Sequence, residues 1–269
     1  MTLHLRSQID CTENSMCARD QLLSLPKDLL LAPSEIHVWF LELRPSLECL
    51  SELRRTLSRD EELRAQTFRL REDRDHFVAS RGLLRKLLAS YTRQRPQQLA
   101  FSYGPTGKPA LESGCAYKDI QFNLSHSGDY ALIAIASGRA VGVDVERLTQ
   151  EREIDSEKIA RRFFSSVELA SFLEYHPSDR IEAFFRHWIR KEAYLKARGF
   201  GLTRHEDGFD APLIKERTST FAHADGTTWR AEEVSFAPDY AGTVVAEGVA
   251  WQLKSFACPN SPTACATKW

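Results

Sequence analysis

Glu192 is the residue whose type and position point most directly to chemistry. The segment from Ile181 to Gly201 has the apolar spacing of an amphipathic helix, at about 100° per residue. Its apolar stripe is predicted to comprise Ile181, Phe184, Phe185, Trp188, Ile189 and Leu195. Glu192 lies near the middle of this stripe, one turn from Trp188 and one turn from Lys196. An ionised carboxylate that faces a core must be paired or must hold a metal ion, so this helix is predicted to carry a site.

A second acidic pair occurs in the segment VGVDVE, from Val141 to Glu146. Strand alternation places the three valines on one face and Asp144 with Glu146 on the other. Alone, such a pair is more typical of a solvent-facing strand. Together with Glu192 it offers three oxygen ligands and no nearby Cys or His cluster, a set that suits a hard divalent cation, Mg²⁺ above all.

Two lysines, Lys191 and Lys196, flank Glu192 on the same helix. The spacing of Glu192 and Lys196 is also that of a surface ion pair worth roughly 0.2–0.5 kcal/mol. On a core-facing stripe we favour a phosphate clamp, because an ammonium group beside a metal-bound phosphate recurs in phosphoryl transfer.

Two loops have residues suited to an anion or a nucleotide. The segment NLSHSG, from Asn123 to Gly128, reads either as a turn that points N–H groups and an imidazole at an anion or as an ordinary hairpin loop. The segment GPTGKP, from Gly104 to Pro109, is flexible enough for a nucleotide loop. It is not a P-loop, because Pro109 follows Lys108 where that motif needs Ser or Thr.

Arginines are frequent in the first half of the chain. We expect most of them to form a solvated helix face, although any that faces a cleft would suit a second phosphate. These residues are Arg64, Arg71, Arg74, Arg81 and Arg85.

The predicted elements repeat in order. Each half is expected to hold a strand, then a helix, then a strand–turn–strand unit: 37–43, 73–91 and 121–136, followed by 140–146, 181–198 and 234–246. The pairs GDYALIAIA with PDYAGTVVA and HVWFLEL with AVGVDVE suggest a duplication. Two similar halves would leave a cleft between them, where ligands usually bind.

The bulk composition is that of an ordinary globular protein. The 269 residues carry 36 basic and 37 acidic side chains, so no overall charge favours nucleic acid or an anionic membrane as a partner. The six cysteines form no CxxC pairs, which fits a reducing compartment. We see no apolar run long enough to span a membrane and no signal peptide at the start of the sequence, so a cytoplasmic location is expected.

Four segments occur in a characteristic order: FNLSHSG, GVDVE, RRFFSSVE from Arg161 to Glu168, and WIRKEAYLKARGFGL from Trp188 to Leu202. Together they resemble a 4′-phosphopantetheinyl transferase of the larger, surfactin-synthetase-activating type, over residues 59–202. The resemblance implies an α+β monomer of two similar α/β halves, the pseudo-duplicated fold of that family, with coenzyme A in the cleft. The expected division is an N-terminal extension (1–34), a half with the nucleotide contacts (35–137), a half with the metal and phosphate site (138–257) and a tail (258–269).

The resemblance also assigns roles to residues of the second half. Asp144, Glu146 and Glu192 would hold Mg²⁺, or Mn²⁺, on the pyrophosphate of coenzyme A. Lys196 would contact a phosphate and, with Glu192, would take part in catalysis.

The nucleotide contacts implied for the first half involve other side chains. Ser125 and His126 would meet the 3′-phosphate end, and Lys108 would touch the nucleotide. The family's lysines before the first-half helix are replaced here by the stretch Arg59–Glu62, which is rich in acids, so Arg64 is the expected substitute.

The implied reaction transfers the 4′-phosphopantetheine arm to a serine of an apo acyl or peptidyl carrier protein and releases 3′,5′-ADP. Glu192, or a water that it orients, is the expected proton acceptor. Two alternatives stay open: a metal-dependent hydrolase of a nucleotide pyrophosphate, and a non-catalytic coenzyme A binder. The sequence does not indicate whether the carrier serves fatty acid, polyketide or nonribosomal peptide synthesis.

Overall fold

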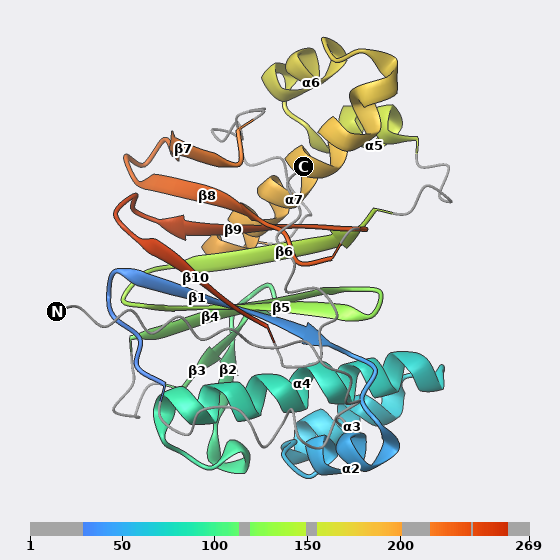
Figure 1. Cartoon of the computed structure of the whole chain (residues 1–269), viewed down its shortest axis with the longest axis vertical. Coiled ribbons are helices and arrows are strands. Elements are labelled where there is room, and N and C mark those ends of the chain that lie inside the picture. The colour runs from blue at the N-terminus through green and yellow to red at the C-terminus, as the bar shows by residue number, and fades with distance from the viewer. Residues whose placement is uncertain (1–28, 113–118, 149–154, 201–215, 238, 258–269) are drawn as a thin grey trace, which may run out of the picture.

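The computed structural model describes residues 29–112, 119–148, 155–200, 216–237 and 239–257. It shows an α+β fold in which two four-stranded sheets pack together and helices cover their outer faces (Figure 1). The first half contains β1 (Glu35–Glu42), α2 (Leu47–Arg54), α3 (Arg59–Thr67), α4 (Arg71–Thr92), the 3₁₀ helix η1 (Pro96–Gln98), β2 (Phe101–Tyr103), β3 (Pro109–Leu111), β4 (Ile120–Ser127) and β5 (Tyr130–Ser137). The second half contains β6 (Val141–Arg147), α5 (Ser156–Phe163), α6 (Ser166–Leu173), η2 (Pro177–Asp179), α7 (Arg180–Arg198), β7 (Thr218–Ala222), β8 (Thr228–Val234), β9 (Tyr240–Glu247) and β10 (Gln252–Ala257).

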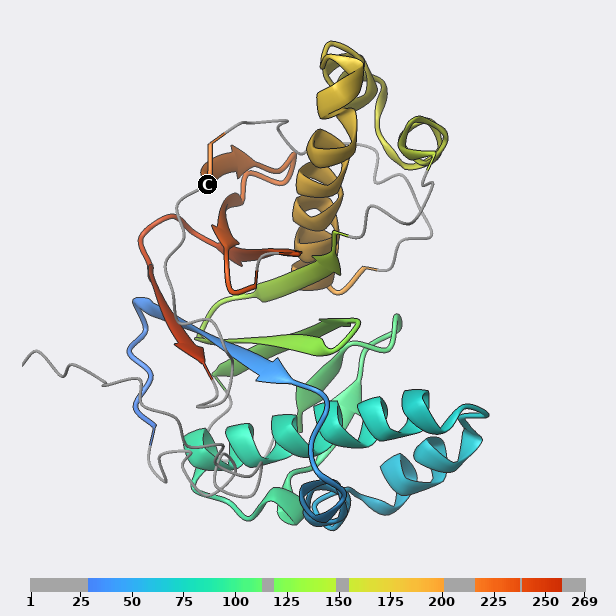
Figure 2. The same ribbon diagram turned by 45° about the vertical axis from the view of Figure 1, so that its right-hand side comes forward.

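The sheets have related strand orders. The first is β10-β1-β5-β4 and the second is β6-β9-β8-β7, while β2 and β3 form a separate hairpin. Within the described ranges, the strand pairs are antiparallel except β1 with β10. The last strand of the second half therefore returns to the edge of the first sheet (Figure 2). The residue ranges predicted for the two halves stay a prediction.

The register of the strands supports the predicted duplication. In the first half Glu42 pairs with Tyr130, and in the second half Arg147 pairs with Tyr240. The next residue closes each ladder in the same way, because the backbone N–H groups of Leu43 and Leu148 donate to the carbonyls of Asp129 and Asp239, both at 2.7 Å. The DY dipeptides recognised in the sequence thus occupy equivalent turns.

The helices repeat a second feature. Ser58 caps α3 and Ser165 caps α6, each in a capping box with the glutamate three residues later. Those glutamates, Glu61 and Glu168, are both buried and both pair with the long helix of their own half.

The core is built from both faces of the first sheet. Leu84 and Leu88 of α4 pack on Trp39, Leu41 and Ile133 on one face. On the other face the two sheets share one cluster of side chains, which includes Ile36, Val38 and Phe40 from β1 and Val141, Val143 and Val145 from β6. The predicted valine face of β6 is confirmed, and the opposite face is left for Asp144 and Glu146. None of the helices in the described parts of the chain is both long and apolar enough to cross a membrane.

Two sequence predictions about these elements are wrong. Ile181 is 44% exposed, because it lies in the first turn of α7, at the open end of the helix. The strand predicted to begin at Val234 instead ends there, as β8. Phe236 leaves the ladder and packs against Phe40 and Tyr240, with ring centroids 4.9 and 5.5 Å apart.

Candidate active site

The site begins where α7 crosses β6, and Gly142 makes the crossing possible. A Cβ atom at this position would lie 2.0 Å from the carbonyl oxygen of Ala193 and 2.4 Å from the backbone nitrogen of Ala197. Only glycine allows the helix to approach so closely. The close approach brings Lys196 over Asp144, two residues further along the strand.

Asp144, Lys196 and Ser125 form a closed hydrogen-bond network. Asp144 is 3% exposed, and its Oδ1 accepts from Ser125 Oγ at 2.8 Å and from Lys196 Nζ at 2.5 Å. Lys196 Nζ also donates to Ser125 Oγ at 2.9 Å. Because Ser125 comes from β4, this network joins the first half of the chain to the second.

Alternate residues of the NLSHS segment face β6. Asn123 Oδ1 accepts from the backbone N–H of Val143 at 2.9 Å, and Ser127 Oγ donates to Glu146 Oε2 at 3.0 Å. His126 lies between Ser125 and Ser127 in the strand, and its side chain is exposed. The segment therefore links the two halves through hydrogen bonds and is also a candidate for anion binding.

Glu192 is buried, as its position in the stripe predicts. Only 8% of it is exposed, and its Oε1 has no hydrogen-bond partner within the described structure. The pKa of Glu192 is raised to about 7, mainly by burial and then by the negative charge of Asp144, with Lys196 opposing the shift. The neighbouring Arg190 and Lys191 instead pair with Glu233 and Glu168.

These acidic groups fit a divalent cation by chemistry. Two buried carboxylate oxygens, Asp144 Oδ2 and Glu192 Oε1, have no hydrogen-bond partner in the described regions, and Glu146 also raises the pKa of Glu192. Such oxygens are the donors that Mg²⁺ and Mn²⁺ prefer.

The spacing of the carboxylates is wide. Among the described residues, one group brings three ligand atoms within 4.8 Å of one another, and it consists of Glu72, His76 and Asp129. The ligand atoms of Asp144, Glu146 and Glu192 therefore do not all lie within 4.8 Å of one another. That these three carboxylates bind one cation stays a prediction.

The group of Glu72, His76 and Asp129 was not predicted. Glu72 and His76 lie one turn apart on α4, a spacing that could have been read from the sequence, but Asp129 joins them only through the fold. Asp129 Oδ1 already accepts from Arg44 Nε at 2.5 Å. One member of the group, Asp129, therefore already forms an ion pair with Arg44.

Lys108 lies close to the predicted site. Its Nζ donates to the carbonyls of Val141 and Ala197 at 3.1 and 3.0 Å, and burial lowers the pKa of this lysine to about 8. The ammonium group therefore binds the start of β6 and the end of α7. The nucleotide contact proposed for Lys108 stays a prediction.

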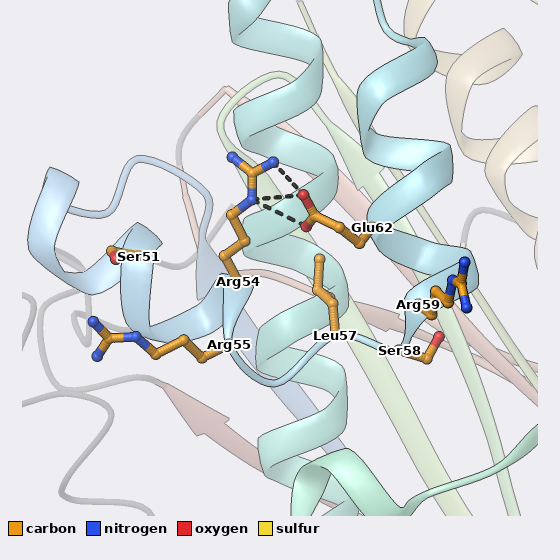
Figure 3. A pocket seen from close by; sticks show the side chains of 7 residues that line it. All are labelled: Ser51, Arg54, Arg55, Leu57, Ser58, Arg59 and Glu62. Carbon is orange, nitrogen blue, oxygen red and sulfur yellow. Dashed lines mark hydrogen bonds and ion pairs between the residues drawn. The ribbon is translucent and has the colours of Figure 1, made fainter.

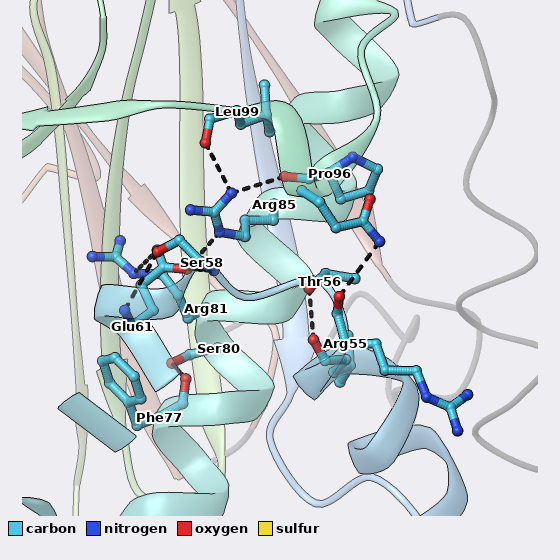
Figure 4. Close-up of polar contacts among 12 residues, drawn as sticks. Arg55, Thr56, Ser58, Glu61, Phe77, Ser80, Arg81, Arg85, Pro96 and Leu99 are labelled. Atoms are coloured by element: carbon cyan, nitrogen blue, oxygen red, sulfur yellow. Dashed lines mark hydrogen bonds and ion pairs between the residues drawn. The ribbon is translucent and has the colours of Figure 1, made fainter. Parts of the chain in front are cut away.

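The arginines of the first half divide into two kinds. Arg64 is exposed on α3, with its guanidinium 5.6 Å from the centre of the Phe77 ring. Arg85 is only 2% exposed and binds Glu61 at 2.5 Å (Figure 4). Arg85 is therefore an exception to the expectation that most of these arginines form a solvated face, because α3 places a buried carboxylate over this part of α4.

A hollow of about 450 Å³ lies between α2 and α3, away from β6 and α7. Its lining residues are Ser51, Arg54, Arg55, Leu57, Ser58, Arg59 and Glu62. Figure 3 shows Arg54 directed to Glu62, while Arg55 and Arg59 point away from each other. The hollow holds no convergent set of groups comparable to those around Asp144.

Comparison with known proteins agrees with this arrangement of halves. Residues 42–138 match the pattern described as "4′-phosphopantetheinyl transferase, N-terminal", and residues 140–245 match the "4′-phosphopantetheinyl transferase superfamily". The chain is 34% identical over 229 residues to the 4′-phosphopantetheinyl transferase HetI of Nostoc sp.. The aligned region covers 85% of this chain and 94% of HetI. The chain is 28% identical over 160 residues to the 4′-phosphopantetheinyl transferase Sfp of Bacillus subtilis, covering 60% of this chain and 68% of the relative.

The fold has two similar halves with acidic and basic side chains between them, and both matching families are transferases. The chain belongs to the 4′-phosphopantetheinyl transferase family and is an enzyme of that class. The resemblance found in the sequence is thereby confirmed.

Proposed function

We propose that this enzyme transfers the 4′-phosphopantetheine arm of coenzyme A to a serine of an apo carrier protein, with Mg²⁺, and releases 3′,5′-ADP. The observation that carries the proposal is the crossing of β6 and α7, where Lys196 pairs with the buried Asp144 and the charges of both act on the buried Glu192. The names of the relatives support the same class of reaction. Mg²⁺ dependence and release of 3′,5′-ADP are parts of the proposal.

The charges at the crossing suit a pyrophosphate substrate. Asp144, Glu146 and Glu192 would hold Mg²⁺ or Mn²⁺, which when bound neutralises negative charge on the phosphates. Lys196 carries a positive charge at the same point and would donate to a phosphate oxygen as charge develops on the leaving group. To do so, its Nζ must exchange the bond that it makes to Asp144.

The serine of the carrier must lose a proton when it attacks the β-phosphate. The raised pKa of Glu192 makes its free carboxylate a better base near neutral pH than an ordinary glutamate. A carboxylate that ligates a cation is a weaker base, so we assign proton removal to Glu192 or to a water that it orients.

The coenzyme is proposed to extend from this crossing toward the first half. Ser125 and His126 would receive the 3′-phosphate end, with Lys108 and Arg64 as further nucleotide contacts. Ser125 Oγ would have to exchange its present bonds to Asp144 and Lys196. A monomeric state, a cytoplasmic location and the absence of nucleic-acid or membrane partners remain predictions.

The test uses purified enzyme, coenzyme A, Mg²⁺ and a panel of apo carrier proteins from the three pathway classes. Intact-mass spectrometry is expected to show one added phosphopantetheine on a carrier serine, and chelation of the cation is expected to stop the addition. Release of 3′,5′-ADP without any carrier would instead indicate a hydrolase. Binding of coenzyme A with no transfer to any carrier would indicate a non-catalytic binder.

A further inference from the structure

The hairpin of β2 and β3 connects the first half of the chain to the catalytic elements of the second. Its two strands have only three residues each, and a ladder so short needs support from outside. The connecting turn is tight, because the N–H of Gly107 donates to Gly104 O at 2.9 Å and the N–H of Gly104 donates to Lys108 O at 3.0 Å. Gly107 has a φ of +84°, which favours glycine.

The tip of the hairpin binds the end of α7. Thr106 Oγ donates to Gly199 O at 2.6 Å, and Lys108 Nζ donates to Ala197 O and to Val141 O of β6. The last carbonyls of a helix lack partners within the helix and attract positive charge, so a lysine at this position is favourable. The tip thereby joins the two elements that carry Asp144 and Lys196.

Strand β2 of the hairpin is held by Arg81 of α4. Its Nη2 donates to Tyr103 Oη at 2.9 Å, and its guanidinium lies 5.5 and 5.8 Å from the ring centres of Phe101 and Tyr103. Its Nε lies 3.1 Å from Glu61 Oε1, and the Arg81 side chain is only 11% exposed. Figure 4 shows Glu61 between Arg81 and Arg85.

Arg85 fixes the chain that leads into the same hairpin. Its Nη1 donates to the carbonyls of Pro96 and Leu99 at 2.8 and 2.9 Å, and its guanidinium lies 4.9 Å from the centre of the Phe101 ring. Both arginines therefore depend on the buried carboxylate of Glu61. A planar guanidinium can stack on a ring and donate in two directions at once, which a lysine cannot do.

We infer that Arg81 is a positioning residue for the transfer reaction, acting through the hairpin on the last turn of α7. It fixes strand β2 of the hairpin, the tip then holds the end of α7 against β6, and Lys196 is kept in reach of Asp144 and of the substrate phosphate. The inference rests on the proposed function for its effect on catalysis. The mechanical link to α7 rests on the contacts alone.

Three variants test this link. Arg81→Met removes the stacked guanidinium, Tyr103→Phe removes one exposed hydroxyl with little risk to folding, and Thr106→Val removes the bond at the tip. Ser102→Ala, at an exposed position in the same hairpin, is the matched control.

Amide hydrogen exchange tests the link to α7 without any measurement of enzyme activity. Amides in the last turn of α7, residues 195–199, are expected to exchange at least about threefold faster in all three variants, with the start of the helix unchanged. The control is expected to match the wild type. Unaltered exchange at 195–199 in Arg81→Met and Tyr103→Phe would overturn the inference.

Kinetics give the second readout. Arg81→Met is expected to lower kcat about tenfold, because small displacements of a catalytic group are costly, and to leave the KM for the carrier protein unchanged. Adding Thr106→Val to Arg81→Met should have no further effect, since both act through one hairpin. Independent, multiplicative losses would contradict the inference. If the wild-type enzyme transfers nothing to any carrier, the proposed function fails, and the exchange experiment still decides the link to α7.

Discussion

Three consecutive charged residues of α7 explain why Glu192 stands apart. Arg190, Lys191 and Glu192 are all buried. The first two have carboxylate partners at 3.3 and 2.6 Å, whereas Glu192 faces two further acidic groups. A buried carboxylate in acidic surroundings is costly to the fold, and such costs are kept at functional sites.

Glu192→Gln is expected to reduce transfer at least about 100-fold and to leave the free energy of unfolding unchanged or about 1–2 kcal/mol higher. Stability should not fall, because the substitution removes a desolvated negative charge. Turnover by mass spectrometry and urea unfolding check the two parts. The control is Glu182→Gln, at a position whose side chain is 73% exposed on the same helix. Normal turnover by Glu192→Gln would exclude the role given to this residue.

Glu168 gives a dependence of stability on pH. Burial raises its pKa, but His187 and Lys191 lower it more, to about 2. Because the pKa in the folded state lies below the ordinary value of about 4.5, the pairing stabilises the protein fully above pH 4.5. The stabilisation is lost as the pH falls through the range from 4.5 to about 2.

Glu168→Gln is accordingly expected to cost about 3 kcal/mol at pH 7, since it leaves Lys191 buried without its carboxylate. The difference in melting temperature between wild type and variant should shrink steadily below pH 4.5. Thermal unfolding from pH 7 to pH 3 measures it. A difference that stays constant with pH would show that the ion pair is not its source.

At the scale of elements, the site depends on the crossing of α7 over β6. Gly142→Ala would place a methyl group against backbone atoms of α7 that cannot move independently. We expect a loss of about 3 kcal/mol in stability and a loss of transfer, because the helix must shift away from Asp144. Gly104→Ala is the control, since its Cβ would lie at an ordinary 3.7 Å from Lys108 O. Equal stability of the two variants would show that the crossing is looser than described.

The sequence predicts the single elements of this crossing well. The apolar period of α7 and the alternation of β6 are local signals, so both elements and the exceptional position of Glu192 can be found without coordinates. The role of Gly142 cannot, because it depends on which helix lies over the strand. The same holds for Lys108, whose carbonyl partners on β6 and α7 are far away in the sequence.

The local signals also have limits within an element. Ile181 fits the apolar period of α7, but a helix end projects beyond the core, and its burial cannot be read from spacing. The residues after Val234 have strand-like composition, yet Phe236 packs against the rings of Phe40 and Tyr240 and joins no ladder in the described structure. In both cases tertiary packing, and not the local sequence, determines the observed structure.

At the scale of the whole molecule, the two halves share one core. The cluster between the sheets contains side chains from β1, β5, β6 and β9, and β10 pairs with β1 across the division of the chain. Neither half could expose this surface alone at low cost. The duplication has therefore produced two similar units that are not independent domains.

Thermal unfolding is expected to be a single cooperative transition, with a calorimetric enthalpy equal to the van't Hoff enthalpy. A shared core and a returning strand couple the two halves, so one should not unfold before the other. Scanning calorimetry of the full chain measures this ratio. Two resolved transitions would contradict the shared core.

The most direct test of the site is a crystal structure of the enzyme with coenzyme A and Mn²⁺, with the metal located by its anomalous scattering. We expect one Mn²⁺ ligated by Asp144, Glu146 and Glu192, at about 2.2 Å from their oxygens, with Lys196 on a phosphate. An ion bound instead at Glu72, His76 and Asp129, or no ion between β6 and α7, would contradict it.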